Sequence, residues 1–420
     1  MKKVLASLFL ISTLLTACGE SSLINQEDNI NQSYISSSKS SRNIFSTIEK
    51  VNAEYKKRNP EIINIKYQAM SESPFAFYRA TAYLFYADAL KNSFLNSINV
   101  NIQGDLHLDN VGTYFASNGK VYYDLNDFDD AYTGSYLYDV SRCATSIYLA
   151  AADAGYNIND SENIAKEFLN AYADSLKSYS SGENAINQPV TSLSKYAQKA
   201  VDKTNQNSYS SFLNEISANG KFIYSDKIRK VSPEIFNNVS EALKNSNAKT
   251  KNNLKVKDIG IYIAGKGSLG RYRYIILTEG ESTKSNDDLV FDLKEAGQPS
   301  ASQVRSKLSG NQAQRIVGAT KYFISYPDTY LGTTNIKDID FYLRKVSPDE
   351  KVNTKKIDKE SDFKDHVKTV AKIVAKAHAI SGKTAEIISD FEKKKDLVNS
   401  FSKDYSNQVK EDFNEFKKSF

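Results

Sequence analysis

The chain has 420 residues, 40% of them hydrophobic, which is enough apolar material for substantial cores in two or three lobes. Its formal net charge is +5, and loss of Lys2 and Lys3 with an N-terminal signal takes it to +3, too small an excess to indicate nucleic-acid binding. Outside the N-terminal segment the only cysteine is Cys143, so we expect no internal disulfide in the mature chain.

Residues 1–17 are predicted to be a secretory signal peptide. Two lysines precede an apolar run at residues 4–15 that is too short to span a bilayer. The following Leu-Thr-Ala-Cys18 resembles a bacterial lipobox, which implies cleavage before Cys18 and lipid attachment to it. A plain signal peptide or a buried helix is the alternative. We therefore expect a lipoprotein of the cell envelope, anchored to the membrane outside the cytoplasm through lipid on Cys18.

Residues 18–43 are rich in Ser, Asn and Gln and poor in apolar residues, which predicts a flexible tether. Helical patterns follow from Ile44 to Lys57 and from Ser73, where Ser73 can cap a helix that Pro74 opens. Arg79 lies inside the apolar pattern of the second helix. It needs a partner, for which the aspartates of residues 124–130 are a candidate, or a route for its charged end to the surface.

The stretch from residue 104 to residue 131 carries most of the candidate chemistry. A loop containing Asp105 and Asn110 leads into two short predicted strands, 111–116 and 120–125, joined by a Ser-Asn-Gly turn. Acidic residues cluster at the end of this predicted hairpin: Asp124, Asp127, Asp129 and Asp130.

This order of groups suits phosphoryl transfer from a nucleotide. That reaction needs a carboxylate to orient and deprotonate the acceptor, and an amide oxygen plus a second carboxylate to hold magnesium. Asp105, Asn110 and an aspartate after the hairpin supply these groups. A turn-rich loop or a calcium site is the alternative, although the residue order of an EF-hand is absent.

Residues 136–152 are predicted to form a buried helix in which Asp139 and Arg142, three residues apart, could pair. Cys143 is expected to be a small buried residue of that helix. Several helices with polar connections are expected in residues 157–250, where no motif is found.

From about Lys257 the pattern changes to strands. Gly265, Gly267 and Gly270 form a Gly-x-Gly-x-x-Gly turn between two β-rich runs, which is typical of the hairpin that covers the nucleotide in kinases. Lys294 lies within the apolar strand pattern of residues 289–296 and could reach phosphates beneath this loop. The alternative is a lysine that protects an edge strand from aggregation.

A helix near residues 311–325 and a strand around residues 341–346 complete this part of the pattern. A long amphipathic helix is predicted from Ser361 to Gly382, with His378 in a structural role near its end. Helices in residues 384–420 are expected to dock through Phe413, Phe416 and Phe420.

Together these segments resemble the bacterial domain of unknown function 2252 family, which is itself similar to aminoglycoside phosphotransferases and protein kinases. The motifs that carry the resemblance are Ser73-Pro-Phe-Ala-Phe-Tyr-Arg79, Gly104-Asp-Leu-His-Leu-Asp-Asn110, Tyr123-Asp-Leu-Asn-Asp-Phe-Asp-Asp130, Tyr138-Asp-Val-Ser-Arg142, Gly265-Lys-Gly-Ser-Leu-Gly270, Leu293-Lys-Glu-Ala296 and Ala375-Lys-Ala-His-Ala-Ile-Ser-Gly382. They occur in the expected order over nearly the whole chain after the tether.

The resemblance to kinases implies roles for the motif residues. Asp105 would be the catalytic base, with Asn110 and Asp127 as magnesium ligands. Asp124 competes with Asp127, but Asp127-Phe-Asp is closer to the Asp-Phe-Gly signature. Lys294 would hold phosphate, and the nucleotide would lie under the glycine loop formed by Gly265, Gly267, Ser268 and Gly270.

The motif order implies a circularly permuted, two-lobed, kinase-like α+β fold, because the glycine loop and Lys294 follow the catalytic loop. We expect a mostly helical larger lobe at 44–250, a smaller lobe of antiparallel sheet plus helix at 251–346, and helices returning to the larger lobe at 347–420. The region expected to follow Lys294 as a helix lacks an acid to pair with it. Either a glutamine such as Gln314 substitutes, or the acid comes from elsewhere.

The expected function is an ATP- and magnesium-dependent phosphotransferase with an unknown small-molecule or protein acceptor. One alternative is a non-catalytic ligand- or protein-binding lipoprotein on a kinase-like scaffold, because ATP is scarce outside the cytoplasm. Another is a nucleotidyl transferase that uses the same groups with a flipped nucleotide.

Overall fold

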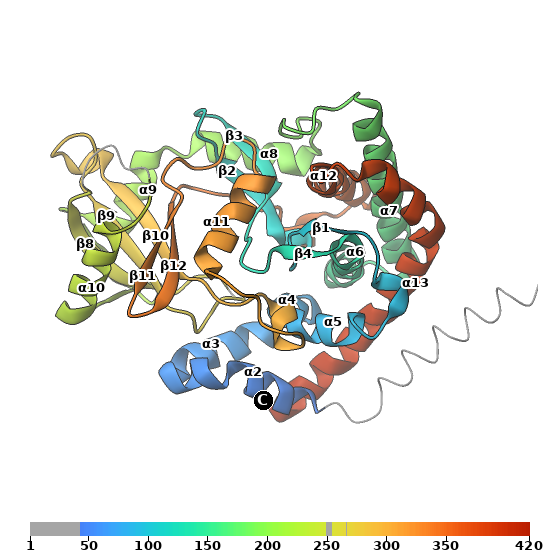
Figure 1. Cartoon of the computed structure of the whole chain (residues 1–420), viewed down its shortest axis with the longest axis horizontal. Helices are drawn as coiled ribbons and strands as arrows, with labels where there is room; N and C mark the ends of the chain where they lie inside the picture. Colours follow the sequence, from blue (N-terminus) through green and yellow to red (C-terminus); the bar gives the residue numbers. More distant parts are fainter. Residues whose placement is uncertain (1–42, 249–253, 266) are drawn as a thin grey trace, which may run out of the picture. The chain divides into compact units, whose positions relative to one another are not determined.

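A six-stranded antiparallel sheet and a group of long helices dominate the fold (Figure 1). The computed structural model describes residues 43–248, 254–265 and 267–420, which include one compact unit beginning at Asn43. The predicted signal peptide, Cys18 and all but the last residue of the predicted tether lie outside the described residues. The expected mixture of helices with an antiparallel sheet is confirmed.

Two of the four N-terminal helices, those that start at Ile44 and Pro74, begin where the sequence predicts. The four helices are α2 (Ile44–Arg58), α3 (Pro60–Met70), α4 (Pro74–Ala80) and α5 (Ala82–Ala89). The hydroxyl of Ser73 accepts a hydrogen bond from the Ala76 N–H at 3.2 Å, and Pro74 is the first helical residue, as expected for this cap.

The predicted hairpin is formed by β2 (Val111–Phe115) and β3 (Val121–Leu125). A second pair, β1 (Asn99–Ile102) and β4 (Tyr132–Ser135), flanks it in the sequence. Because Ile102 lies opposite Tyr132, the chain leaves and re-enters this pair at one place. The loop before the hairpin and the loop after it are therefore held side by side.

Four long helices pack together beside these strands: α6 (Tyr136–Asp153), α7 (Ile158–Ser181), α12 (Glu360–Ala379) and α13 (Thr384–Ser419). Cys143 is fully buried in α6, as predicted. The C-terminal segment is a single helix whose Phe416 contacts the rings of Tyr67 and Phe77, so its predicted docking face covers α3 and α4.

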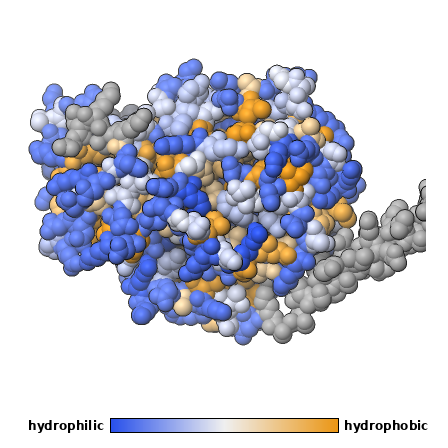
Figure 2. Space-filling model, viewed as in Figure 1, coloured by the Kyte–Doolittle hydropathy of each residue, from blue (hydrophilic) through white to orange (hydrophobic). Residues whose placement is uncertain are grey.

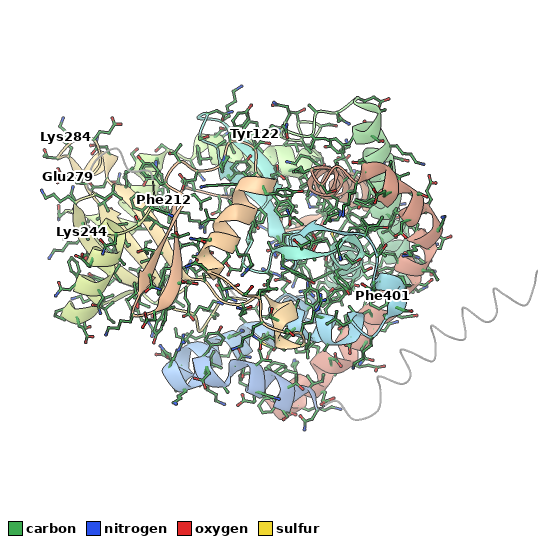
Figure 3. The ribbon with its side chains drawn as sticks, viewed as in Figure 1. Tyr122, Phe212, Lys244, Glu279, Lys284 and Phe401 are labelled. Atoms are coloured by element: carbon green, nitrogen blue, oxygen red, sulfur yellow. The ribbon has the colours of Figure 1, made fainter. Side chains whose placement is uncertain are left out.

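The same helix also packs on α5. Phe401 of α13, labelled in Figure 3, stacks on Tyr405 and meets the ring of Phe85 edge-on. Figure 2 shows mainly hydrophilic side chains on the face viewed, with apolar ones in separate patches. Within the part of the chain that is described, each helix is too short or too polar to serve as a membrane span.

The large sheet has the strand order β11-β12-β10-β9-β8-β7. Its strands are β7 (Ile228–Lys230), β8 (Val256–Tyr262), β9 (Arg273–Thr278), β10 (Leu289–Glu295), β11 (Gly332–Ile336) and β12 (Ile339–Lys345). Strand β10 is an inner strand and Lys294 is buried, so the edge-strand explanation of this lysine is wrong.

Helices cover both faces of the sheet. The helices and short strands around it are α9 (Tyr209–Ile216), β5 (Ser217–Ala218), β6 (Lys221–Phe222), α10 (Pro233–Lys244) and α11 (Gln312–Phe323), whereas α8 (Lys195–Gln206) packs on the hairpin of β2 and β3. Val239 of α10 packs with Leu293 on one face, and Leu213 of α9 packs with Leu277 on the other. The sheet also includes β7, which lies before residue 251, where the smaller lobe was expected to begin.

Candidate functional site

The loop carrying Asp105 is fixed by helix α6. The carboxylate of Asp139 accepts the backbone N–H groups of Gln103 at 2.7 Å and Gly104 at 2.9 Å. Arg142, one turn further along α6, binds Asp105 instead of Asp139. The predicted ion pair between Asp139 and Arg142 is therefore wrong, because each side chain holds a different part of this loop.

Asp105 lies in a largely buried, charged environment. Nε of Arg142 is 2.8 Å from its Oδ1, the guanidinium is fully buried, and the aspartate side chain is 15% exposed. Burial raises the pKa of Asp105 to about 7, while Arg142 opposes the rise and Asp130 adds to it. A carboxyl with a pKa near neutrality is suited to act as a general base.

Asn110 closes the same loop. It ends a short 3₁₀ turn (Leu108–Asn110), and its Nδ2 donates to the carbonyl oxygen of Asp105 at 2.9 Å. This bond fixes the amide with its nitrogen toward the backbone, so the oxygen is the atom that can serve as a ligand. The Asn126 N–H donates to the Asn110 carbonyl at 3.0 Å and ties the loop to the end of the hairpin.

We name residues 126–131 the acid loop. It passes so close to the preceding loop that a Cβ on Gly104 would lie 2.0 Å from the carbonyl oxygen of Asp130. With φ at +86° as well, only glycine fits at position 104. The two loops predicted to carry the catalytic groups are therefore in direct contact.

Asp127 occupies the exposed end of the acid loop. Its backbone is left-handed, with φ at +57°, and its side chain is 48% exposed. Nε2 of Gln103 donates to its carbonyl oxygen at 2.6 Å, while its Oδ1 lies 3.7 Å from Nζ of Lys294. The structure thus brings together the two residues on which the sequence-based hypothesis depends.

Asp129 is the close partner of Lys294. Its carboxylate receives Nζ of Lys294 at 2.6 Å, a guanidinium nitrogen of Arg271 at 2.9 Å and the hydroxyl of Tyr342 at 2.8 Å. Burial alone would raise the pKa of Asp129, but Lys294 and Arg271 hold it below its usual range. The acid that pairs with Lys294 therefore comes from the acid loop, while Gln314 of α11 is exposed.

Asp124 is placed differently from Asp127. Its carboxylate is fully buried, pairs with Nζ of Lys376 on α12 and accepts the Leu125 N–H at 2.9 Å. Among the described residues no group of three or more His, Cys, Asp or Glu side chains is arranged to hold a metal ion. A magnesium site here would thus combine few protein ligands with water and phosphate oxygens, as is usual for this ion.

The glycine loop joins β8 to β9 as predicted, and its final turn contacts the N-terminal helices. A Cβ on Gly270, where φ is +104°, would lie 2.7 Å from Cβ of Tyr55. Gly267 faces the carbonyl oxygen of Arg79, and Ser268 donates its hydroxyl to the carbonyl of Gly265 at 3.3 Å. Arg271 follows directly and binds Asp129, which ties this hairpin to the acid loop.

Arg79 neither pairs with the predicted acid cluster nor extends freely to the surface. It binds Asp109, which lies in the loop between Asp105 and Asn110, at 2.6 Å. Both residues line a cavity of about 310 Å³ together with Phe75 and Lys351, whose Nζ donates to the Asp109 carbonyl at 2.7 Å. A cavity of about 340 Å³ lies elsewhere, between Tyr224, Phe236 and Asp258.

Sequence reasoning missed the roles of Arg142, which binds Asp105, and of three residues that bind the acid loop from outside: Arg271, Arg315 and Tyr342. Two of them carried a signal, since Arg271 directly follows the glycine motif and Arg142 lies in a motif shared with the family. Arg315 and Tyr342 lie in ordinary amphipathic and alternating patterns. Nothing local distinguishes them from surface residues.

A family model described as "Uncharacterized protein conserved in bacteria (DUF2252)" matches residues 58–419. The chain belongs to this family. The DUF2252 match runs from the end of α2 to the end of α13, so it includes Asp105, Asp127, Lys294 and the glycine loop, and it confirms the family expected from the motifs. No curated protein and no solved structure matches the chain.

Proposed function

We propose that this DUF2252 protein is a magnesium- and ATP-dependent phosphotransferase with a permuted kinase-like site. The observation that carries the proposal is the position of Lys294, whose ammonium lies 2.6 Å from Asp129 and 3.7 Å from Asp127. A lysine from an inner strand and carboxylates from a loop far earlier in the chain thus share one site.

The proposed reaction assigns one task to each group. The acceptor oxygen attacks the terminal phosphorus of ATP, the bond to the bridging oxygen breaks, and ADP leaves with that electron pair. Asp105 takes the proton of the acceptor hydroxyl, for which its pKa of about 7 is suitable. Lys294 binds phosphate oxygens, and the glycine loop closes over them.

Asn110 and Asp127 are the residues that would hold magnesium. The fixed amide of Asn110 and the half-exposed carboxylate of Asp127 fit an ion that keeps most of its oxygen ligands as water and phosphate. When bound, the ion would neutralise charge on the phosphates. Asp124 is a poorer candidate because its carboxylate is buried against Lys376.

We further propose that the protein acts in the cell envelope as a lipoprotein anchored through Cys18. The support is the N-terminal sequence alone: a basic start, a short apolar run and a small-residue site ending in cysteine. Metabolic labelling with a fatty acid would test this proposal. Cys18→Ala protein should lose the label and the membrane fraction.

Stabilisation by Mg²⁺ with ATP tests whether Lys294 belongs to a nucleotide site or forms only a structural ion pair with Asp129. Mg²⁺ with ATP at about 100 times Kd should raise the unfolding free energy of wild-type protein by about 2.7 kcal/mol, seen as a higher Tm. Lys294→Met should lose most of this gain while remaining folded, because Arg271 and Tyr342 still bind Asp129.

Lys257→Met is the matched control. Lys257 lies in the same sheet and forms an ion pair of the same length, 2.6 Å, with Asp288. It should lower the Tm of the free protein but keep the ATP-dependent gain. If wild-type protein shows no gain, a scaffold that binds another ligand is favoured. Release of pyrophosphate in place of ADP would favour nucleotidyl transfer.

A further inference from the structure

Arg315 of helix α11 binds the backbone of the acid loop. One Nη atom donates to the carbonyl oxygen of Ala131 at 2.5 Å, and the other donates to the carbonyls of Asp129 and Gly297, each at 2.8 Å. Its Nε donates to Oε1 of Gln312 at 2.9 Å, one turn earlier on the helix. The guanidinium thus binds neutral oxygens of two chain segments at once.

This arrangement makes Arg315 the link between α11 and the site. The acid that binds Lys294 is Asp129, which belongs to the acid loop and not to α11. Helix α11 contacts the same loop without an ion pair, because Arg315 donates to its main-chain carbonyl oxygens. A planar fork of donors in fixed positions is suited to bind several carbonyls, and a lysine ammonium is not an equivalent replacement.

The acid loop needs such support because part of its backbone is unfavourable. Asp127 has a left-handed conformation, which for a residue other than glycine costs of order 1 kcal/mol and persists only where neighbours hold it. Gln103 binds the beginning of the loop, through the carbonyl oxygens of Asn126 and Asp127. Arg315 binds the end of the loop, through the carbonyl oxygens of Asp129 and Ala131.

We propose that Arg315 is a positioning residue that holds the acid loop, and with it Asp127 and Asp129, in the geometry seen here. This role rests on contacts within the chain. Its consequence for magnesium and nucleotide binding rests on the proposed function. The position of the helix is coupled to the site through these carbonyl bonds, so displacement of α11 would free the part of the acid loop that carries Asp129.

Hydrogen–deuterium exchange measured on peptides covering residues 126–131 tests the proposal. In Arg315→Met protein the exchange of these amides should be about tenfold faster, because buried hydrogen bonds to a charged donor are lost and the loop opens locally. Exchange in the hairpin strands β2 and β3 should stay close to the wild-type rate. Arg315→Lys keeps the charge and should show the same faster exchange in residues 126–131. It replaces Arg315→Met in this test if the methionine variant does not fold.

Ile316→Ala is the control, since Ile316 is the next residue on α11 and its buried side chain packs in the core. It should lower the Tm without selective exchange in the acid loop. If exchange there is no faster in either Arg315 variant than in Ile316→Ala, Arg315 does not position the loop.

A second measurement separates this proposal from the proposed function. The stabilisation of each protein by Mg²⁺ with ATP should be weaker in Arg315→Lys than in Ile316→Ala. Failure of wild-type protein to respond to Mg²⁺ with ATP would overturn the phosphotransferase, whereas the exchange result alone decides whether Arg315 holds the loop.

Discussion

Arg142 on helix α6 binds the carboxylate of Asp105 with Nε 2.8 Å from Oδ1, and the guanidinium is completely buried. The pair fixes the carboxylate in place. Burial nevertheless raises the pKa of Asp105 to about 7, because the stabilisation from Arg142 only partly offsets the loss of water and the repulsion by Asp130 and Asp127.

The proposed reaction should therefore depend on pH through Asp105. Only the ionised carboxylate accepts a proton, so the rate of phosphate transfer should rise about tenfold per pH unit below about 7 and level off above it. Asp105→Asn should lower the rate by several orders of magnitude and abolish this dependence. Asp226→Asn, at an exposed position, is the control. An unchanged profile in the Asp105 variant would exclude it as the base.

The buried pair of Asp124 and Lys376 should behave as a structural unit. Lys376→Met leaves a buried carboxylate without its counter-ion and should lower the unfolding free energy by about 3–5 kcal/mol. The double variant Asp124→Leu with Lys376→Met removes both charges and should recover most of this loss. Urea denaturation of four proteins, the wild type, the two single variants and the double variant, measures the coupling, and additive losses in the double variant would contradict it.

Two glycines of the glycine loop should respond differently to alanine. Gly270→Ala should destabilise the fold by about 1–3 kcal/mol or more, because φ is +104° and the new Cβ would lie 2.7 Å from Tyr55. At Gly267 the nearest atom, the Arg79 carbonyl oxygen, would be 3.7 Å from the Cβ, so stability should change by less than about 0.5 kcal/mol.

Gly267→Ala is thus the variant that tests the loop's function. If the loop closes over a nucleotide, the added methyl group should weaken the stabilisation by Mg²⁺ with ATP while the Tm of the free protein stays constant. Equal ATP-dependent gains in wild-type and Gly267→Ala protein would show that this position does not contact the nucleotide.

Two buried histidines should make the fold sensitive to acid. Burial lowers the pKa of His366 to about 4 and that of His107 well below its usual value, whereas an unfolded chain binds the proton near pH 6.5. Between these values the unfolded state carries more protons, so stability falls as the pH falls from about 6.5 toward about 4.

His366 alone accounts for up to about 3 kcal/mol of this change. His366→Gln cannot take up the proton, so its unfolding free energy should fall less between pH 7.5 and pH 5 than that of the wild-type protein. Urea denaturation at the two pH values gives the comparison. The same slope in both proteins would mean that His366 is not a source of the acid sensitivity.

Sequence reasoning identified the local structure of the site because each part carries its own periodicity. The hairpin after Asn110, the glycine turn between two strands and the lysine in an apolar strand are each visible within about ten residues. The inner position of β10 in the sheet could not be predicted from the local sequence. Whether a strand lies at an edge depends on neighbours that join the sheet from elsewhere in the chain.

Partner choice between distant segments could not be predicted in the same way. The helical spacing of Asp139 and Arg142 suggested a pair, but backbone N–H groups bind the first and Asp105 binds the second. For Lys294 the sequence left open either Gln314 on the next helix or an acid from elsewhere, and the partner is Asp129 of the acid loop. For Asp139 and Arg142, tertiary contacts outweighed a pairing within the helix that is worth only about 0.2–0.5 kcal/mol.

The beginning and the end of the described unit meet. The Ile44 N–H donates to Oε1 of Glu415 at 2.9 Å, and Phe416 lies against Phe45, Tyr67 and Phe77. Helices α2 to α4 precede α13 in the chain, so they are synthesised before the surface that covers them. Until α13 has been synthesised, the rings of Phe45, Tyr67 and Phe77 lack their contacts with Phe416, and apolar surface exposed at that stage favours aggregation.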